Sequence, residues 1–131
     1  MIRAASLALA LFALPASHAV AAEILIHDAK SQPESLAAAA DGTLFVGSAS
    51  TLYIYRVKKG ATAADVFVDA GNEGAGTFFL GQLVDDAAKT LWACQLTPVP
   101  GTTPAMRRTA LRGFDLASGK EKLRWTLPGD N

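Results

Sequence analysis

The chain has 131 residues, with 12 basic and 12 acidic side chains and a formal net charge of zero. Neither sign of charge gathers in one half, which argues against a nucleic-acid partner, because such binding needs a basic patch. The single cysteine, Cys94, excludes an internal disulfide framework and a cysteine-based metal motif. We expect Cys94 to pack as a small hydrophobic residue.

Residues 1–22 predict a cleavable signal peptide. Arg3 supplies a positive start, an apolar run follows, and Ala19, Ala21 and Ala22 offer small residues for cleavage. The apolar run is about ten residues long, well short of the roughly twenty that a membrane-spanning helix needs. We therefore expect cleavage after Ala21 or Ala22 and a periplasmic or secreted location, with an uncleaved membrane anchor as the alternative. No later stretch is apolar enough to predict a stable membrane span.

The remaining residues, 23–131, number about 110, which is the length of one ordinary domain. Helical periodicity is weak, and short apolar runs recur between Gly, Asp, Asn and Pro residues, a pattern typical of strands and turns. Asp41 and Gly42 predict a hairpin with a type I′ turn. The strands that we expect are residues 24–27, 35–39, 44–47, 52–57, 65–68, 81–84, 91–95, 111–116 and 123–127.

The two halves of this region align with each other. Residues 41–46 match residues 88–93 at an offset of about 47, and residues 52–57 match residues 111–116 at about 59. An exposed, proline-rich loop of roughly twelve residues, 97–108, explains the larger second offset. A repeating unit of about 40 to 50 residues with four short strands is typical of a β-propeller blade.

We therefore expect an all-β fold, a partial β-propeller with about two four-stranded antiparallel blades after the signal peptide. The blade-like units are residues 33–71 and 80–129, and two hairpin pairs in a sandwich are the alternative. Because a propeller normally closes with at least four blades, we expect residues 23–131 to be the N-terminal part of a larger propeller domain. The side chains expected in the core are Leu44, Val46, Leu83, Leu91, Ala93 and Cys94.

These segments resemble the family of senescence marker protein, gluconolactonase and luciferin-regenerating enzyme, six-bladed propellers related to strictosidine synthase. The likeness is carried by residues 32–36, 41–48, 55–57 and 111–127. It implies a metal-dependent hydrolase that acts on a small-molecule lactone or ester, and a chain that is inactive without its later blades. The alternative is a non-catalytic periplasmic propeller that serves as a binding or interaction module, because one fold carries many functions.

The resemblance implies one metal ligand, Glu34. In the family, a Glu just after the first strand binds a divalent cation together with Asn and Asp residues of later blades, and Glu34 matches by its position and by the preceding Pro33. Ca²⁺ takes such oxygen ligands and would polarise a lactone carbonyl. The remaining ligands and the catalytic residues are expected beyond Asn131, so the cation is expected only in the complete propeller. A solvated turn residue is the alternative reading of Glu34.

Other charged or flexible features receive no functional assignment. Arg107 and Arg108, with Arg112 nearby, are expected on a solvated loop. His27 is expected at the surface, at the end of a strand. Residues 71–76 are rich in glycine and predict a flexible loop between the two units.

Overall fold

The computed structural model describes residues 23–102 and 106–128, so the predicted signal peptide lies outside the described residues. The all-β prediction is confirmed, because the only helical element among the described residues is a single 3-10 turn, η1 (Gly71–Glu73). None of these residues forms a helix with the length and hydropathy that a membrane crossing requires. The strands are β1 (Pro33–Ala38), β2 (Leu44–Ser48), β3 (Tyr53–Val57), β4 (Asp65–Asp69), β5 (Phe78–Asp85), β6 (Thr90–Pro98), β7 (Arg107–Asp115) and β8 (Glu121–Thr126).

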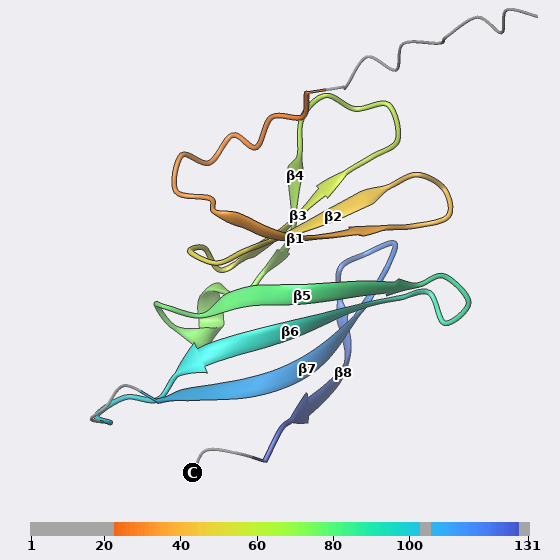
Figure 1. The fold of residues 1–131 in the computed structure, drawn as a ribbon. Coiled ribbons are helices and arrows are strands. Elements are labelled where there is room, and N and C mark those ends of the chain that lie inside the picture. Colours follow the sequence, from red (N-terminus) through yellow and green to blue (C-terminus); the bar gives the residue numbers. More distant parts are fainter. Residues whose placement is uncertain (1–22, 103–105, 129–131) are drawn as a thin grey trace, which may run out of the picture.

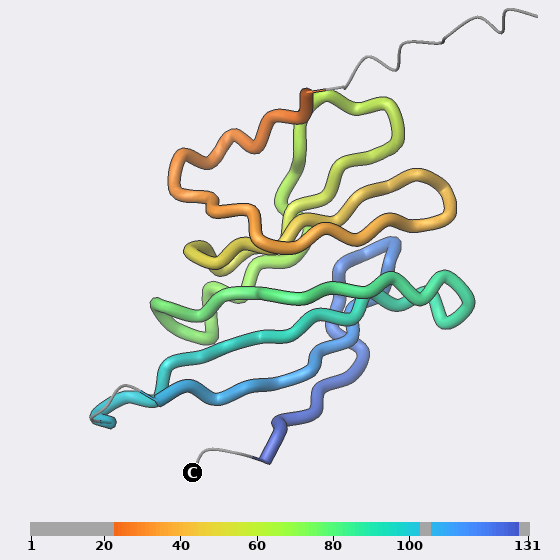
Figure 2. Tube along the Cα trace, in the orientation of Figure 1, coloured from red at the N-terminus to blue at the C-terminus, as the bar shows by residue number. Residues whose placement is uncertain are grey.

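The eight strands form one curled sheet made of two antiparallel runs (Figure 1). β1 to β4 pair in chain order, and so do β5 to β8, because short turns join each strand to the next. We call β1–β4 unit 1 and β5–β8 unit 2. A single residue pair, Ser48 with Phe79, joins the two units through β2 and β5. The tube in Figure 2 follows the chain from unit 1 into unit 2 with one crossing between them.

The hydrophobic core lies between the two units. Strand alternation explains which residues enter it: in β6, Leu91 and Ala93 are buried, whereas Trp92 and Cys94 between and after them point to the other side of the sheet and are half-buried. The buried apolar cluster consists of Ala37, Phe45, Ile54, Val68, Ala70, Phe79, Leu91, Ala93 and Phe114. Each unit therefore covers one face of the other.

One of the predicted core residues is misplaced. Leu91 and Ala93 are buried, Leu44, Val46 and Cys94 are half-buried, and Leu83 is 64% exposed. The prediction for Leu83 is wrong because the β5–β6 register shifts between Leu80 and Gln82, a bulge that pairs Leu83 with Trp92. Trp92 lies on the face of unit 2 that is turned away from unit 1, and Leu83 shares that face.

The hairpin predicted at Asp41 and Gly42 is confirmed, but its turn type is not. A type I′ turn needs positive φ at both central residues, and only Gly42 has it, at 88°. The turn instead starts at Ala39, whose carbonyl accepts a hydrogen bond from the Gly42 amide at 2.9 Å. Unit 2 repeats this turn with Lys89, which has a φ of 52° and donates its amide to the carbonyl of Asp86 at 3.3 Å.

Two further predictions differ from the structure. Residues 97–108 are not a simple loop, because β6 continues to Pro98 and β7 begins at Arg107, and these two residues pair across the hairpin. Cross-strand pairing thus extends both strands into a segment whose prolines suggested a loop. Residues 24–27 form no regular strand, and only a single parallel bridge joins Leu25 to Ala63.

Candidate functional site

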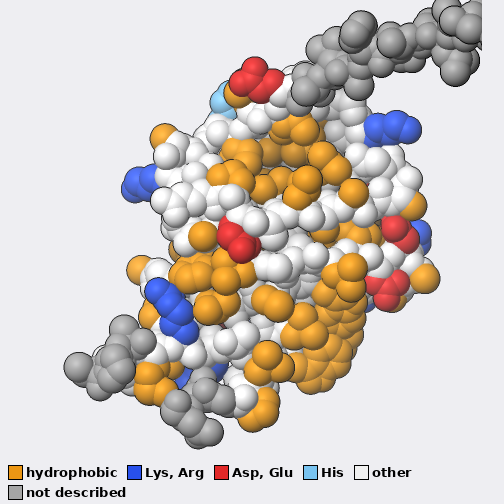
Figure 3. All heavy atoms as spheres, in the orientation of Figure 1, with side chains coloured by type: hydrophobic (Ala, Val, Ile, Leu, Met, Phe, Trp, Pro, Cys, Tyr) orange, Lys and Arg blue, Asp and Glu red, His pale blue; other side chains and the backbone are white. Residues whose placement is uncertain are grey.

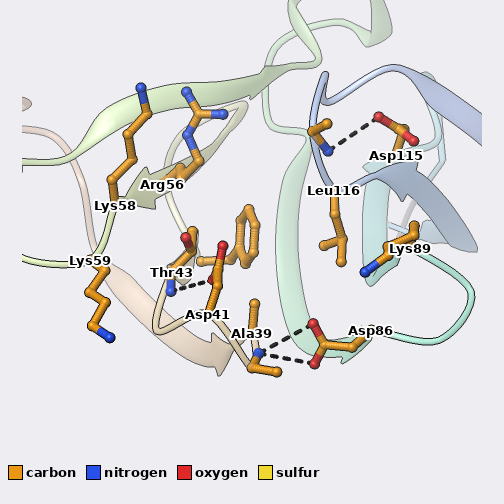
Figure 4. A pocket seen from close by; sticks show the side chains of 13 residues that line it. Ala39, Asp41, Thr43, Arg56, Lys58, Lys59, Asp86, Lys89, Asp115 and Leu116 are labelled. Carbon is orange, nitrogen blue, oxygen red and sulfur yellow. Dashed lines mark hydrogen bonds between the residues drawn. The ribbon is translucent and has the colours of Figure 1, made fainter.

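A groove opens between the turns of the two units (Figure 4). The β1–β2 turn and the end of β3 form one wall, and the β5–β6 and β7–β8 turns form the other. Its volume is about 770 Å³, which is enough for a small organic molecule. The charged side chains that line it are Asp41, Arg56, Lys58, Lys59, Asp86, Lys89 and Asp115.

Hydrogen bonds between turns fix the two walls relative to each other. The amide of Ala40, in the β1–β2 turn, donates to both carboxylate oxygens of Asp86 in the β5–β6 turn, at 3.2 and 3.0 Å. The amide of Leu116 donates to the carbonyl of Lys89 at 3.1 Å, which ties the β7–β8 turn to the β5–β6 turn. The shape of the groove is thus set by the backbone of three turns.

The carboxylates of the groove hold turns together. Asp41 accepts a hydrogen bond from the Thr43 amide at 2.8 Å, and Asp115 accepts from the hydroxyl and the amide of Ser118 at 2.8 and 2.9 Å. These hydrogen bonds lower the pKa of both carboxyl groups, because they favour the charged form. Asp41 and Asp115 are therefore ionised, and their oxygens accept hydrogen bonds from neighbouring turn residues. This arrangement suits a structural role better than proton transfer.

The cationic side chains of the groove differ in their partners. Arg56 is paired with Asp65, with 2.5 Å between Nη2 and Oδ2, whereas the ammonium groups of Lys58, Lys59 and Lys89 form no hydrogen bond or ion pair within residues 23–102 and 106–128. Figure 4 shows Lys89 on the unit 2 wall and the other two lysines on the unit 1 wall. Each ammonium group is a compact charge with three donors.

The floor of the groove is apolar. Phe45 is 1% exposed and packs against Phe67, with 4.9 Å between ring centroids and a tilt of 54°. Leu116 and Ala39 extend this apolar surface from the two walls. A groove that combines lysines with apolar lining residues fits a small ligand that has an apolar body and a negative charge.

Glu34, the metal ligand that the resemblance implied, lies away from this groove. It is exposed near the start of β1, and the groove begins after the other end of that strand, at Ala39. No three His, Cys, Asp or Glu side chains of the described residues lie close enough together to hold a metal ion. Ca²⁺ takes six to eight oxygen ligands. Glu34 alone does not fit that requirement, so we derive no chemical step through a metal.

The structure shows that Arg112, which lies in the predicted strand 111–116, is buried. This side chain is 5% exposed in β7, where its Nη1 donates to Gln95 Oε1 at 2.7 Å and its Nη2 is bonded to Glu121. Its guanidinium lies 4.8 Å from the ring centroid of Phe114 and within 3.6 Å of the Glu73 carboxylate. Arg112 is thus a paired cation inside unit 2, apart from the exposed pair Arg107 and Arg108.

A sequence signal for this burial exists. Ala110, Arg112 and Phe114 alternate along β7 and share the face that is turned toward unit 1. Glu73 belongs to the same cluster, because its carboxylate accepts a hydrogen bond from Arg124 at 2.5 Å. The segment 71–76, predicted to be a flexible loop, therefore contains one residue that is fixed by two arginines. Arg107 and Arg108 are exposed, as expected, but in a strand.

Comparison with known proteins gives no significant match to a family model, to a curated protein or to a solved structure.

Proposed function

We propose that unit 1 and unit 2 are two neighbouring blades of a β-propeller. The support is architectural: each unit has four antiparallel strands in chain order, and each places the same turn, at Gly42 and at Lys89, between its first two strands. A blade has this meander of four strands and packs face to face against its neighbours. The resemblance to the gluconolactonase family agrees with this arrangement.

We propose that the protein is a propeller-type binding module whose ligand is a small organic anion with an apolar body. The observation that carries this proposal is that the ammonium groups of Lys58, Lys59 and Lys89, which form no hydrogen bond or ion pair with the part of the chain that the structure describes, line the same groove as the apolar residues Leu116 and Ala39. A carboxylate would accept hydrogen bonds from the lysines, and its hydrocarbon part would cover the floor. Nothing in this binding requires a chemical reaction.

Calorimetric titration with hexanoate, gluconate and hexan-1-ol tests the proposal. We expect hexanoate to bind best, because gluconate lacks the apolar body and hexanol lacks the charge. Replacement of Lys58 and Lys89 together by Gln should weaken hexanoate binding about tenfold or more, the effect of losing charged hydrogen bonds. Lys30→Gln, at an exposed position outside the groove, is the matched control. Equal binding of hexanoate and hexanol, or no effect of the double substitution, would contradict the proposal.

A metal-dependent hydrolase of lactones or esters is the second candidate function. The observation that favours it is the exposed Glu34 on β1, the strand of unit 1 that lies beside β5 of unit 2. On this proposal, later blades supply the remaining oxygen ligands. In a longer form of the protein that hydrolyses lactones in the presence of Ca²⁺, Glu34→Gln should abolish turnover and leave the fold intact. Unchanged turnover would reject Glu34 as the ligand.

We also propose that the protein is exported and cleaved after Ala21 or Ala22. The pattern of Arg3, the apolar run and the small residues supports this proposal. The intact mass of the periplasmic or secreted form should match a chain that starts at Ala22 or Glu23. Full-length protein with Met1 in the membrane fraction would contradict it.

A further inference from the structure

An apolar surface covers the side of unit 2 that is turned away from unit 1. We call it the outer face, and it consists of Leu80, Leu83, Trp92, Leu111, Leu123 and Trp125. Trp92 and Trp125 stack with their ring centroids 5.4 Å apart, and an apolar hollow of about 390 Å³ lies beside Trp92 and Leu83. Figure 3 shows hydrophobic side chains gathered over both units. Half of Trp125 is exposed.

The strand registers identify the counterpart of this face in unit 1. Phe45 follows the β1–β2 turn as Trp92 follows the β5–β6 turn, three residues after Gly42 and Lys89 respectively. One row of paired residues crosses each unit. In unit 1 the row is Gly47, Ile54 and Val68, and in unit 2 it is Cys94, Leu111 and Trp125. The counterparts of Trp92, Leu111 and Trp125 are therefore Phe45, Ile54 and Val68.

These counterparts are all in the core. Phe45, Ile54 and Val68 are 1%, 0% and 5% exposed, because unit 2 covers them. Their equivalents on the outer face are covered by nothing in the described residues. The outer face of unit 2 is thus apolar and equivalent in position to the face of unit 1 that packs against unit 2.

Unit 1 carries a surface of the opposite kind. In unit 2, the residues that cover unit 1 include Leu91, Ala93 and Phe114. Their counterparts in unit 1 by the same registers are Leu44, Val46 and Val57, on the side turned away from unit 2. We call this side the far face; its partly or fully exposed residues are Leu36, Leu44, Val46 and Val66, whereas Val57 is 2% exposed. Leu36 and Val66 on it are 65% and 50% exposed.

We infer that copies of this chain associate head to tail, with the far face of one copy covering the outer face of the next. The contact would repeat the packing that already joins unit 2 to unit 1 inside each chain. Such a contact uses two different surfaces, so it builds a ring or an open array and not a two-fold dimer. The segment 23–32 already lies against one part of the far face, since Asp28 accepts a hydrogen bond from the hydroxyl of Tyr55, which is 2% exposed, at 2.7 Å. The contact would therefore form on the exposed part of the far face, at Leu36 and Val66.

The central part of the outer face carries no charge. The cross-strand rows Leu83, Trp92, Gly113, Leu123 and Cys94, Leu111, Trp125 contain no charged side chain. Burial of this surface by a second copy would remove two tryptophan rings from water. The inference extends the proposed blade arrangement and is independent of any ligand of the groove, so the loss of association and the loss of hexanoate binding can be told apart.

Tryptophan emission and light scattering test the inference without any substitution. The two tryptophans of the chain both lie on the outer face, so their emission reports its burial alone. We expect a mass of at least two chains at high concentration, and a red shift of the emission as dilution releases single chains. A single-chain mass at all concentrations, or emission that does not change as the mass falls, would overturn the inference.

Two variants separate head-to-tail association from other modes. Trp125→Lys alters only the outer face, and Leu36→Lys alters only the far face. Each variant alone should associate at least tenfold more weakly than the unaltered chain, whereas an equimolar mixture should give a complex of one copy of each, joined by the two intact faces. Ala75→Lys adds the same charge at an exposed loop position and is the control.

The pattern of outcomes decides between modes of association. If Leu36→Lys still forms dimers and Trp125→Lys does not, two outer faces pair with each other and the head-to-tail inference is wrong. If the mixture forms no complex although both variants keep the circular dichroism spectrum of the folded chain, it is also wrong. If either variant is unfolded, the dilution experiment on the unaltered chain still tests whether association buries the outer face.

Discussion

The amide nitrogen of Ala40 lies 3.2 and 3.0 Å from the two carboxylate oxygens of Asp86, a residue 46 positions later in the sequence. These hydrogen bonds join a turn of unit 1 to a turn of unit 2. Hydrogen bonds to a charged acceptor are stronger than those between neutral groups. Because both hydrogen bonds cross from unit 1 to unit 2 at the groove, they hold the groove at its width. Its removal should affect both stability and the local opening of the β1–β2 turn.

We predict that Asp86→Ala lowers the free energy of unfolding by about 1–2 kcal/mol, because an exposed amide bonded to a carboxylate contributes on that scale. Asp86→Asn, which keeps one acceptor oxygen, should lose about half as much. Urea unfolding gives the first readout, and hydrogen exchange at the Ala40 amide gives the second. The Gly42 amide, bonded to Ala39 in the same turn, is the internal reference for that exchange. Unaltered exchange at Ala40 in Asp86→Ala would show that the contact is unimportant in solution.

A pH dependence follows from Glu121. Its hydrogen bond with Arg124, and then the one with Arg112, lower the pKa of this carboxyl from 4.5 to about 2. A pKa that is lower in the folded state contributes stability above pH 4.5, and this contribution is lost as pH falls from about 4.5 to about 2. The carboxylate is partly exposed, so screening by water reduces the contribution to about 1 kcal/mol.

We predict that Glu121→Gln destabilises the protein at pH 7 and that its difference from the unaltered chain shrinks as pH falls toward 2. Urea unfolding at several pH values between 7 and 2.5 measures this difference. Because Gln keeps the shape and one acceptor oxygen, the comparison isolates the charge. Parallel pH profiles for the two proteins would mean that Glu121 is not held ionised by its arginines.

The strands could be predicted because their signals are local. The predicted segment 44–47 is β2 (Leu44–Ser48), and 65–68 is β4 (Asp65–Asp69), since alternation and turn residues mark both ends. The ends of β6 and β7 could not be predicted. Their extension depends on pairs such as Pro98 with Arg107, which only the formed hairpin brings together.

The faces and the groove were less accessible to prediction from sequence. A bulge of one residue moves every later side chain to the other side of the sheet, which is why Leu83 is exposed. The groove is lined by Lys59 and Lys89, which lie in different units and share one groove only because the units pack against each other. The candidate ligand Glu34 came from a resemblance, and among the described residues it belongs to no group of three or more His, Cys, Asp or Glu side chains that could hold a metal ion.

Glu34 leads to a prediction for this chain by itself. Titration with Ca²⁺ should show no tight binding, because one carboxylate and water leave most of the six to eight ligand positions to solvent. Glu34→Gln should change the free energy of unfolding by no more than about 0.5 kcal/mol, as is usual for an exposed residue, since the Glu34 carboxylate has no hydrogen bond or ion pair with residues 23–102 or 106–128. Micromolar Ca²⁺ binding that disappears in Glu34→Gln would refute this prediction and reveal ligands that the described residues do not group together.

The last prediction compares two strand glycines. Gly47 is buried in β2, where an added methyl group would lie 2.5 Å from the side-chain nitrogen of Gln82, 2.6 Å from Ser35 Oγ and 2.7 Å from the backbone oxygen of Phe79. Gly81 is exposed in β5, and a methyl group there would meet no atom within 4 Å. Both glycines lack positive φ, so backbone strain does not separate them. Any difference between the two alanine variants therefore reports the crowding at Gly47, where β2 lies between β1 of unit 1 and β5 of unit 2.

We predict that Gly47→Ala lowers the free energy of unfolding by about 1–3 kcal/mol, the usual cost of overpacking a buried site. Gly81→Ala should be neutral or should stabilise the protein by up to about 1 kcal/mol, because it reduces the conformational freedom of the unfolded chain. Urea unfolding of both variants under one set of conditions gives the comparison. If Gly47→Ala were as stable as Gly81→Ala, β2 and β5 would not approach as closely as the pairing of Ser48 with Phe79 requires.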